Sequence, residues 1–328
     1  MTRAETSPDT DVSGAWDQDN QAWWDWYVSL ADNSAEAGEL QRAPALPDVE
    51  LPSDAEVIVQ LAMPYPLTRG DVEFFRHNGF IKLKEVLSTG AVIKLRSELR
   101  RLLRAEFSVD PDEGAQDRFL SLEMIWPDNP LLKAYVTSPR LAQISANLIQ
   151  ADAVRLYHDN VLAKQPGCGR TPWHYDEHHF PLDTNDVVTA WAPAQAIPLP
   201  MGPLAFAYPL DVHELVNAVA FEKSGTGYDR GVAEVFARNN VAIDETPFEL
   251  GEVSFHHNLS FHTAARNLTD RSRIVLANTY YADGARVVDS PTMVSGDWQK
   301  FMPGVGPGEI AASRLNPVCW PAEEVGHE

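Results

Sequence analysis

The stretch Trp173-His174-Tyr175-Asp176 places a histidine and an aspartate two residues apart in a segment with the character of a β-strand. Successive side chains of a strand point to opposite faces, so His174 and Asp176 project from the same face. One imidazole nitrogen and one carboxylate oxygen can therefore reach a single point. A His-x-Asp pair is common in proteins, and it becomes informative only together with more distant residues.

A second segment, from Ser260 to Arg273, supplies those residues. His262 is a candidate third ligand, because two histidines and a carboxylate on one face of a metal ion form the facial triad of non-haem Fe(II) oxygenases. The segment reads as strand, polar turn and strand, and we expect a hairpin that returns Arg273 alongside His262. A guanidinium there can pair two-pronged with a carboxylate of a small dicarboxylic acid. An ordinary surface ion pair is the alternative for Arg273.

Three segments together resemble a known family. The segment from Leu67 to Leu87, the stretch Thr171–Asp176 and the segment from His262 to Arg273 are similar in order and spacing to the phytanoyl-CoA dioxygenase family of Fe(II)/2-oxoglutarate oxygenases. The resemblance covers roughly residues 65 to 285. It implies an α+β fold: a double-stranded β-helix, that is, a cupin-like jelly-roll barrel, flanked by helices.

The resemblance also implies roles for individual residues. His174, Asp176 and His262 would be the catalytic iron ligands, and Arg273 would hold the distal carboxylate of 2-oxoglutarate. The implied cofactors are Fe(II), 2-oxoglutarate as cosubstrate, and O2. Further cosubstrate contacts are expected at Lys164, Thr171 and Trp191.

Two positions bear on the type of reaction. Many relatives carry Ser or Thr two residues after the distal histidine, whereas this chain has Ala264, so a hydroxyl contact to the cosubstrate is missing or supplied elsewhere. Related halogenases have Gly or Ala in place of Asp176, so the carboxylate predicts an oxygenase, and a hydroxylase rather than a halogenase. Desaturation, epoxidation and ring closure stay open.

Two other classes of protein are compatible with part of the pattern. A cupin-like metal enzyme, such as an isomerase or a 2-oxoglutarate-independent dioxygenase, could use the same triad but would have no need of Arg273. A non-catalytic small-molecule-binding barrel would more naturally have lost one of the ligands, and all three are present.

Composition agrees with a soluble enzyme and says little more about function. With 328 residues and 44% hydrophobic residues, the chain is long enough for one catalytic domain, expected over 67–328 after an extension of residues 1–66. Two distant cysteines, Cys168 and Cys319, favour free thiols over disulfides. We expect a cytoplasmic protein, since neither a signal-peptide pattern nor a run of about 18 apolar residues occurs.

The net charge of −21 is the other global feature. A negative field disfavours nucleic acids, anionic membranes and other polyanions as partners, and it argues mildly against acyl-CoA substrates. We therefore expect a small-molecule substrate that is uncharged or cationic, although an acidic surface also serves solubility.

The extension and the first helices have local signals. Residues 1–14 are expected to be disordered, and the aromatic-rich stretch 16–31 to form a helix on the barrel, with a substrate lid or homodimer contact as alternatives. The proline-rich residues 42–66 predict an extended connector. A helix should begin after Thr68 and stop at Gly79. The arginines of the next helix, which include Arg96, are expected to be solvated.

The segment between the two halves of the candidate site is the most distinctive part. Residues 209–244 form an insertion with two helix-like stretches, about 212–221 and 229–239, which we interpret as a lid over the substrate. His256 and His257 are expected in the core or around the metal rather than on it.

Overall fold

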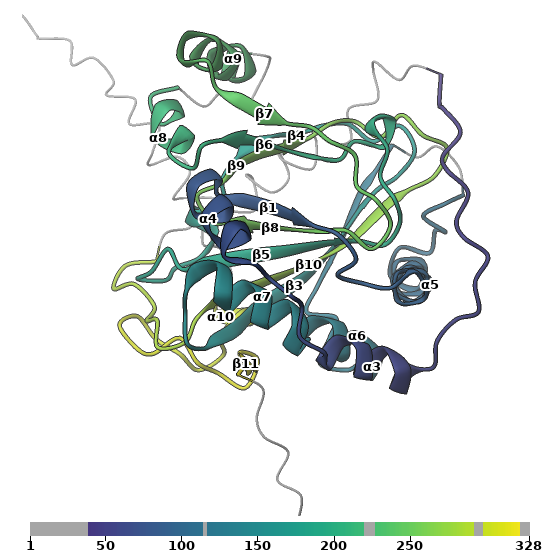
Figure 1. The fold of residues 1–328 in the computed structure, drawn as a ribbon, viewed down its shortest axis with the longest axis horizontal. Helices are drawn as coiled ribbons and strands as arrows, with labels where there is room; N and C mark the ends of the chain where they lie inside the picture. Colours follow the sequence, from purple (N-terminus) through teal and green to yellow (C-terminus); the bar gives the residue numbers. More distant parts are fainter. Residues whose placement is uncertain (1–38, 114–116, 220–226, 292–297, 322–328) are drawn as a thin grey trace, which may run out of the picture.

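Two antiparallel β-sheets face each other in the computed structural model, which describes residues 39–113, 117–219, 227–291 and 298–321 (Figure 1). Within these ranges the larger sheet has the strand order β1-β8-β5-β10-β3-β11, with β2 also paired to β3, and the smaller sheet has the order β4-β9-β6-β7. The larger sheet consists of β1 (Phe80–Leu83), β2 (Phe119–Glu123), β3 (Val154–Lys164), β5 (Val187–Pro193), β8 (Val253–His257), β10 (Arg273–Ala282) and β11 (Val318–Trp320). The smaller sheet consists of β4 (Thr171–His174), β6 (Leu204–Tyr208), β7 (Ala242–Asp244) and β9 (Phe261–Ala264).

The barrel interior lies between the two sheets. Its apolar cluster combines Trp191 and Val275 of the larger sheet with Leu204 and Ala264 of the smaller one. The rings of Phe80 in β1 and Phe206 in β6 stack across the gap at 4.4 Å between centroids. Alternation along each strand explains this arrangement, because every second side chain points into the barrel. The predicted jelly-roll fold is confirmed.

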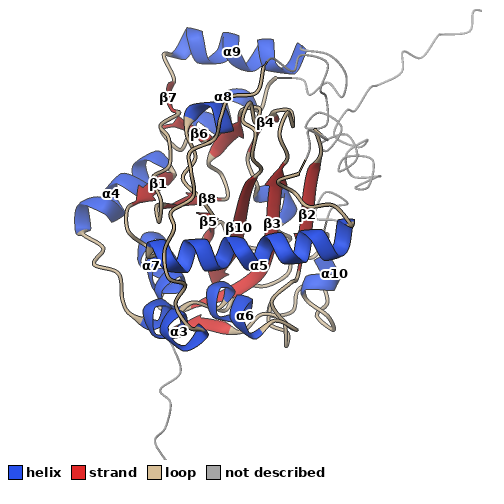
Figure 2. Ribbon diagram, turned by 90° about the vertical axis from the view of Figure 1, so that its right-hand side faces the viewer, coloured by secondary structure: helices blue, strands red, loops and turns tan. Residues whose placement is uncertain are grey.

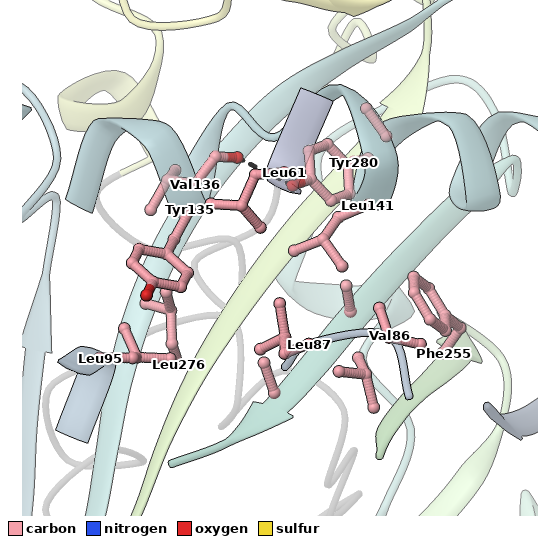
Figure 3. Packing of buried hydrophobic residues seen from close by; sticks show 14 of the residues in the cluster. Leu61, Val86, Leu87, Leu95, Tyr135, Val136, Leu141, Phe255, Leu276 and Tyr280 are labelled. Carbon is pink, nitrogen blue, oxygen red and sulfur yellow. Dashed lines mark hydrogen bonds between the residues drawn. The ribbon is translucent and has the colours of Figure 1, made fainter. Parts of the chain in front are cut away.

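The outer face of the larger sheet is covered by helices. Figure 2 shows α5 (Thr89–Phe107) lying across these strands, and α3 (Asp54–Ala62), α6 (Pro130–Val136) and α7 (Pro139–Ile149) pack on the same side. Leu95 of α5 and Leu276 of β10 belong to this main core (Figure 3). The buried Tyr280 hydroxyl donates to the Val136 carbonyl at 2.8 Å, so its polar group is satisfied inside the apolar layer (Figure 3).

Helix boundaries follow capping chemistry. Thr68 begins α4 (Arg69–Asn78) with a capping box to Asp71, and Gly79 ends it in the left-handed conformation at φ 79°, as predicted. The prediction of an extended connector over 42–66 was wrong for α3, where Ser53 and Glu56 form another capping box. The prolines of this region flank the helix and do not interrupt it, because Pro52 precedes the cap and Pro64 follows the end.

The prediction of solvated arginines on α5 was also wrong for Arg96. Its residue surface is only 2% exposed. Spacing explains the error: Arg96 lies four residues after Val92 and three before Leu99, so it shares the buried face of the helix.

The insertion contains α8 (Val212–Val216), α9 (Gly227–Asn239) and β7, which pairs with β6 (Figure 1). Its helices cover the outer face of the smaller sheet, where Trp173 stacks on Phe261 at 5.4 Å between centroids and meets Phe236 of α9 edge-on at 5.1 Å. The short α10 (Trp298–Phe301) packs in a separate apolar cluster with Tyr157.

Some expectations fall outside the described residues, namely the tail 1–14 and the aromatic helix 16–31. Among the helices that are described, none combines the length and apolar character needed to cross a membrane.

Candidate metal and cosubstrate site

The three predicted metal ligands come together on the smaller sheet. His174, the last residue of β4, pairs with His262 of β9, and their rings lie 4.2 Å apart between centroids. The prediction that one strand carries both His174 and Asp176 was wrong, because β4 ends at His174 and Asp176 lies in the following turn. The backbone N–H of Asp176 donates there to the Asn258 carbonyl at 2.8 Å. One suitable ligand atom from each of the three lies within 4.8 Å of the others, close enough for a single ion to touch all three. We call these residues the metal cluster.

Hydrogen bonds set the tautomers of both histidines. Nδ1 of His174 lies 2.8 Å from the Pro172 carbonyl oxygen, and Nδ1 of His262 lies 2.9 Å from the Ser260 carbonyl oxygen. Because a carbonyl oxygen only accepts, each Nδ1 donates, and each Nε2 presents its lone pair to the cluster. The backbone thus orients both imidazoles as metal ligands.

The charge states also suit a metal. Burial, and after it the neighbouring His262 ring, lowers the pKa of His174 to about 4. Burial likewise lowers the pKa of His262 to about 4. Burial alone would raise the pKa of Asp176, but His262, a hydrogen bond with His256, and His174 hold it well below its usual range. Near neutral pH the cluster therefore presents two neutral imidazoles and a carboxylate, the forms that bind metal.

A third histidine, His256 of β8, supports the carboxylate. Asp176 Oδ1 lies 3.5 Å from Nε2 of His174 and 3.9 Å from Nε2 of His262, so this oxygen faces the cluster. The other oxygen, Oδ2, lies 3.4 Å from Nε2 of buried His256. His256 thus contacts the carboxylate and leaves Oδ1 toward the metal position. Sequence reasoning placed His256 around the metal but gave it no partner.

Two buried cations lie side by side at the start of β10. Arg273 pairs in register with Lys164 of β3, and alternation points both inward, since Ile274 and Ala163 belong to the helix-covered core. Burial, and after it Arg273, lowers the pKa of Lys164 well below its usual range. Arg170 and Arg266 act on Lys164 in the same direction. We call Lys164 and Arg273 the cation pair.

The cation pair reaches across to the smaller sheet. Lys164 Nζ donates to the carbonyls of Ala264 at 3.2 Å and Ala265 at 3.0 Å, two and three residues after His262. Arg273 Nη1 donates to the Gly202 carbonyl at 2.6 Å. Glycine is required at 202, because its φ is +73° and an added Cβ would lie 2.2 Å from the Ala265 carbonyl oxygen.

The connection between His262 and Arg273 is not the predicted hairpin. β9 belongs to the smaller sheet and β10 to the larger one, so residues 265–272 cross between sheets and do not form a hairpin turn. That prediction was wrong because sequence alternation does not tell which sheet a strand joins. The guanidinium nevertheless points into the barrel that carries His262.

The remaining predicted contacts lie close by. Trp191, on the inner face of β5, has its ring centroid 5.3 Å from the guanidinium carbon of Arg273. Thr171 is buried opposite Ala264. The hydroxyl absent at Ala264 is not replaced by Thr263, whose side chain donates to the Thr171 carbonyl.

The loop that carries Asp176 is connected to the insertion. The Tyr175 hydroxyl donates to Asn217 Oδ1, just after α8, at 3.1 Å and also lies 2.9 Å from His178 Nε2. Tyr228 of α9 donates to the Trp173 carbonyl at 3.0 Å. A movement of the insertion would therefore shift the residues next to His174 and Asp176.

A jelly-roll barrel with a two-histidine, one-carboxylate cluster and an inward arginine defines a class, the metal-dependent oxygenases of the cupin-like fold. The profile of the phytanoyl-CoA dioxygenase family matches residues 75–275. The chain belongs to this family.

Individual relatives are distant. The peroxisomal phytanoyl-CoA dioxygenase of Bos taurus is 24% identical over 239 residues, which cover 64% of this chain and 69% of that protein. The solved structure of the α-ketoglutarate-dependent carbocyclase SnoK from nogalamycin biosynthesis has 23% identity and a TM-score of 0.62, covering 78% of this chain and 99% of that one. The epimerase SnoN, in complex with Fe3+, α-ketoglutarate and nogalamycin RO, has 20% identity and a TM-score of 0.59, with coverages of 76% and 97%.

Family membership confirms the predicted cofactors, which are Fe(II), 2-oxoglutarate and O2. The residues present fit them. The metal cluster offers two imidazole nitrogens and a carboxylate oxygen, and the buried Arg273 guanidinium offers positive charge for a dicarboxylate. The chain is therefore an iron- and 2-oxoglutarate-dependent oxygenase.

Proposed function

We propose that this protein hydroxylates a small, uncharged or cationic metabolite of specialised metabolism, with conversion of 2-oxoglutarate to succinate. In this proposal His174, Asp176 and His262 hold Fe(II), and Arg273 holds the distal carboxylate of the cosubstrate. The observation that carries it is the presence of the metal cluster and the buried cation pair in the same barrel.

The cation pair is the feature that favours this function over the other metal-dependent enzymes that could use the same metal cluster. A charged group in the interior is destabilising unless an opposite charge accompanies it. Arg273 is buried in register with Lys164, so a bound dicarboxylate would bring a negative charge next to the buried guanidinium. A cupin-like isomerase or a 2-oxoglutarate-independent dioxygenase has no comparable use for it. Trp191 and Thr171 would complete the walls around the cosubstrate.

The bound metal supplies the oxidative chemistry, in which one oxygen atom of O2 enters succinate as CO2 leaves and the other enters the substrate as a hydroxyl. The protein supplies orientation. The backbone carbonyls at Pro172 and Ser260 fix the two imidazoles, and Arg273 sets the direction from which the cosubstrate approaches. The apolar walls between the sheets exclude water.

The choice of hydroxylation rests on Asp176. A carboxylate at this position fills the metal site that a halide would need, which favours transfer of oxygen. The carbocyclase and epimerase among the structural neighbours indicate that this fold also hosts other outcomes.

The substrate class rests on the net charge of −21 and on the insertion. A polyanionic acyl-CoA would approach against a repulsive field. Helices α8 and α9 pack on the outer face of the smaller sheet and are bonded to Tyr175 and Trp173, so in this proposal the insertion acts as a lid by moving the loop that carries Asp176.

The test is turnover with Fe(II), 2-oxoglutarate and candidate metabolites in chloride buffer under labelled O2, with succinate and product followed by mass spectrometry. We expect succinate formation that depends on both Fe(II) and 2-oxoglutarate, and a product with one labelled oxygen. Absence of succinate would refute the cosubstrate assignment, a chlorinated product would refute the reaction type, and efficient turnover of an acyl-CoA would refute the substrate class.

A further inference from the structure

A buried polar network lies on the helix side of the larger sheet, directly behind Arg273. Its centre is Arg96 of α5, whose residue surface is 2% exposed. Arg96 Nη2 donates to both carboxylate oxygens of Asp112 at 2.8 Å, and Nη1 donates to Gln195 Oε1. The three side chains come from α5, from the segment after it and from the segment after β5.

This network binds the main chain on both sides of Arg273. On one side, the Ser272 N–H donates to Asp112 Oδ1 at 3.1 Å, and the Ser272 carbonyl accepts from Arg96 Nη2 at 3.3 Å. On the other side, the Ile274 N–H donates to Gln195 Oε1 at 3.1 Å, and Gln195 Nε2 donates to the Ile274 carbonyl at 3.0 Å. Both peptide neighbours of Arg273 are thus bonded to side chains from distant parts of the chain.

We call these bonds to residues 272 and 274 the clamp. Ile274 packs in the helix-covered core, so the Arg273 side chain leaves from the opposite face and enters the barrel. There its guanidinium donates to the Gly202 carbonyl and lies against Trp191. The backbone beside Arg273 is thus held by bonds outside the barrel, while the Arg273 side chain makes its contacts inside the barrel.

We propose that Arg96, with Asp112 and Gln195, is a positioning network that fixes Arg273 to receive the distal carboxylate of 2-oxoglutarate. The proposal rests on the proposed cosubstrate role of Arg273. Two-pronged pairing between a guanidinium and a carboxylate needs a defined direction of approach, and the clamp fixes the backbone from which the side chain extends. Arg96 does not itself touch the cosubstrate.

General stabilisation is a weaker account of the network. Replacing a buried ion pair by apolar groups of similar volume is often neutral or stabilising, so stability alone does not explain a charged pair here. The same helix offers a comparison: Arg101 pairs with Glu98 through two bonds of 2.9 and 2.7 Å, but its side chain is 60% exposed and makes none of the bonds that hold residues 272 and 274.

The experiment compares Arg96→Lys, Gln195→Met and the control Arg101→Lys in the full chain. Lysine keeps the buried charge beside Asp112 but has no fork to reach Gln195 and Ser272 together, and Gln195→Met leaves the Arg96–Asp112 pair intact. Binding of 2-oxoglutarate to the Fe(II)-loaded protein is measured calorimetrically without O2. Amide hydrogen exchange of the peptide that contains residues 272–274 is measured in parallel.

For both network variants we expect the dissociation constant of 2-oxoglutarate to rise about three- to tenfold, on the order of one lost hydrogen bond, with little change in iron affinity. Exchange at residues 272–274 should become faster, and Arg101→Lys should change neither quantity. In an Arg273→Lys background, Arg96→Lys should add little, because both changes act on the same contact.

Two results would overturn the proposal. If Arg273→Lys weakens 2-oxoglutarate binding but neither Arg96→Lys nor Gln195→Met does, the network only stabilises the fold. If Arg273→Lys itself leaves 2-oxoglutarate binding unchanged, the cosubstrate role of Arg273 fails and the positioning role falls with it.

Discussion

The metal cluster and the cation pair are built in different ways. The metal cluster comes from β4, the turn after it and β9, and its histidines are oriented by carbonyls two residues away in the chain. The cation pair comes from β3 and β10, and the backbone around Arg273 is held by side chains that lie 160 and 79 residues away. The first is a local construction and the second a long-range one. Replacing a residue of the metal cluster should therefore abolish iron binding and turnover. Replacing a residue around the cation pair should only weaken the binding of 2-oxoglutarate.

The largest effect is expected from removing a metal ligand. His174→Ala leaves only His262 and Asp176, so iron binding and turnover should be lost while the fold persists, since an open catalytic site contributes less to folding than a closed structural one. Iron content and succinate formation are the measurements, with the exposed His77→Ala as control. Retained iron and activity in His174→Ala would show that the ligand set is different.

A graded effect is expected at the cation pair. Arg273→Lys keeps the charge but loses the two-pronged geometry, so the Michaelis constant for 2-oxoglutarate should rise about tenfold or more if roughly 1.5 to 3 kcal/mol of charge-assisted bonding is weakened. The constant for the substrate should change less. Arg271→Lys is the matched control, because Arg271 is two residues away and donates to the Pro44 carbonyl outside the barrel.

A smaller effect is expected at His256, which supports the metal cluster from the larger sheet. His256→Leu removes the contact with Asp176 Oδ2 and should weaken iron binding by about tenfold, the lower end of the range for such supporting residues. His256→Gln can still offer an N–H and should recover part of the loss. Equal iron affinity in the leucine and glutamine variants would mean that the contact does not matter.

The smallest effect concerns a histidine outside both groups. Burial lowers the pKa of His158 from 6.5 to about 4, so the unfolded chain binds more protons than the folded one between these values. Stability should be full above about pH 6.5 and should fall as the pH drops toward 4. His158→Phe, placed beside Phe301, should make the melting temperature of the metal-free protein less sensitive to pH between 7 and 5. An unchanged slope would contradict the assignment.

The same division explains what the sequence could predict. The spacing of the family motifs predicted His174, Asp176, His262 and Arg273 as site residues, because such motifs are local patterns. Strand alternation did not predict the placement of Asp176, since β4 ends at His174 and Asp176 lies in the following turn. The crossing of residues 265–272 between sheets could not be seen, since the partner of a strand is decided by tertiary packing.

Arg96 is an instructive miss. The spacing from Val92 and Leu99 places Arg96 on the apolar face of α5. The prediction that it is solvated followed only from its being a charged residue. Its partners, Asp112 and Gln195, lie 16 and 99 residues away and have no motif of their own. A charged residue at an apolar-face position of a helix is therefore a sequence signal of a buried polar network.

The most direct test of the account is an anaerobic titration of the Fe(II)-loaded protein with 2-oxoglutarate, followed by the visible charge-transfer absorption that appears when the cosubstrate chelates iron. We predict a saturable signal for the parent protein and no signal for His174→Ala. For Arg273→Lys we predict the same signal at a concentration about tenfold higher or more, the shift expected from weakened charge-assisted bonding. No signal in the parent protein, or an unchanged midpoint in Arg273→Lys, would contradict a barrel in which the metal cluster and the cation pair hold the two ends of one cosubstrate.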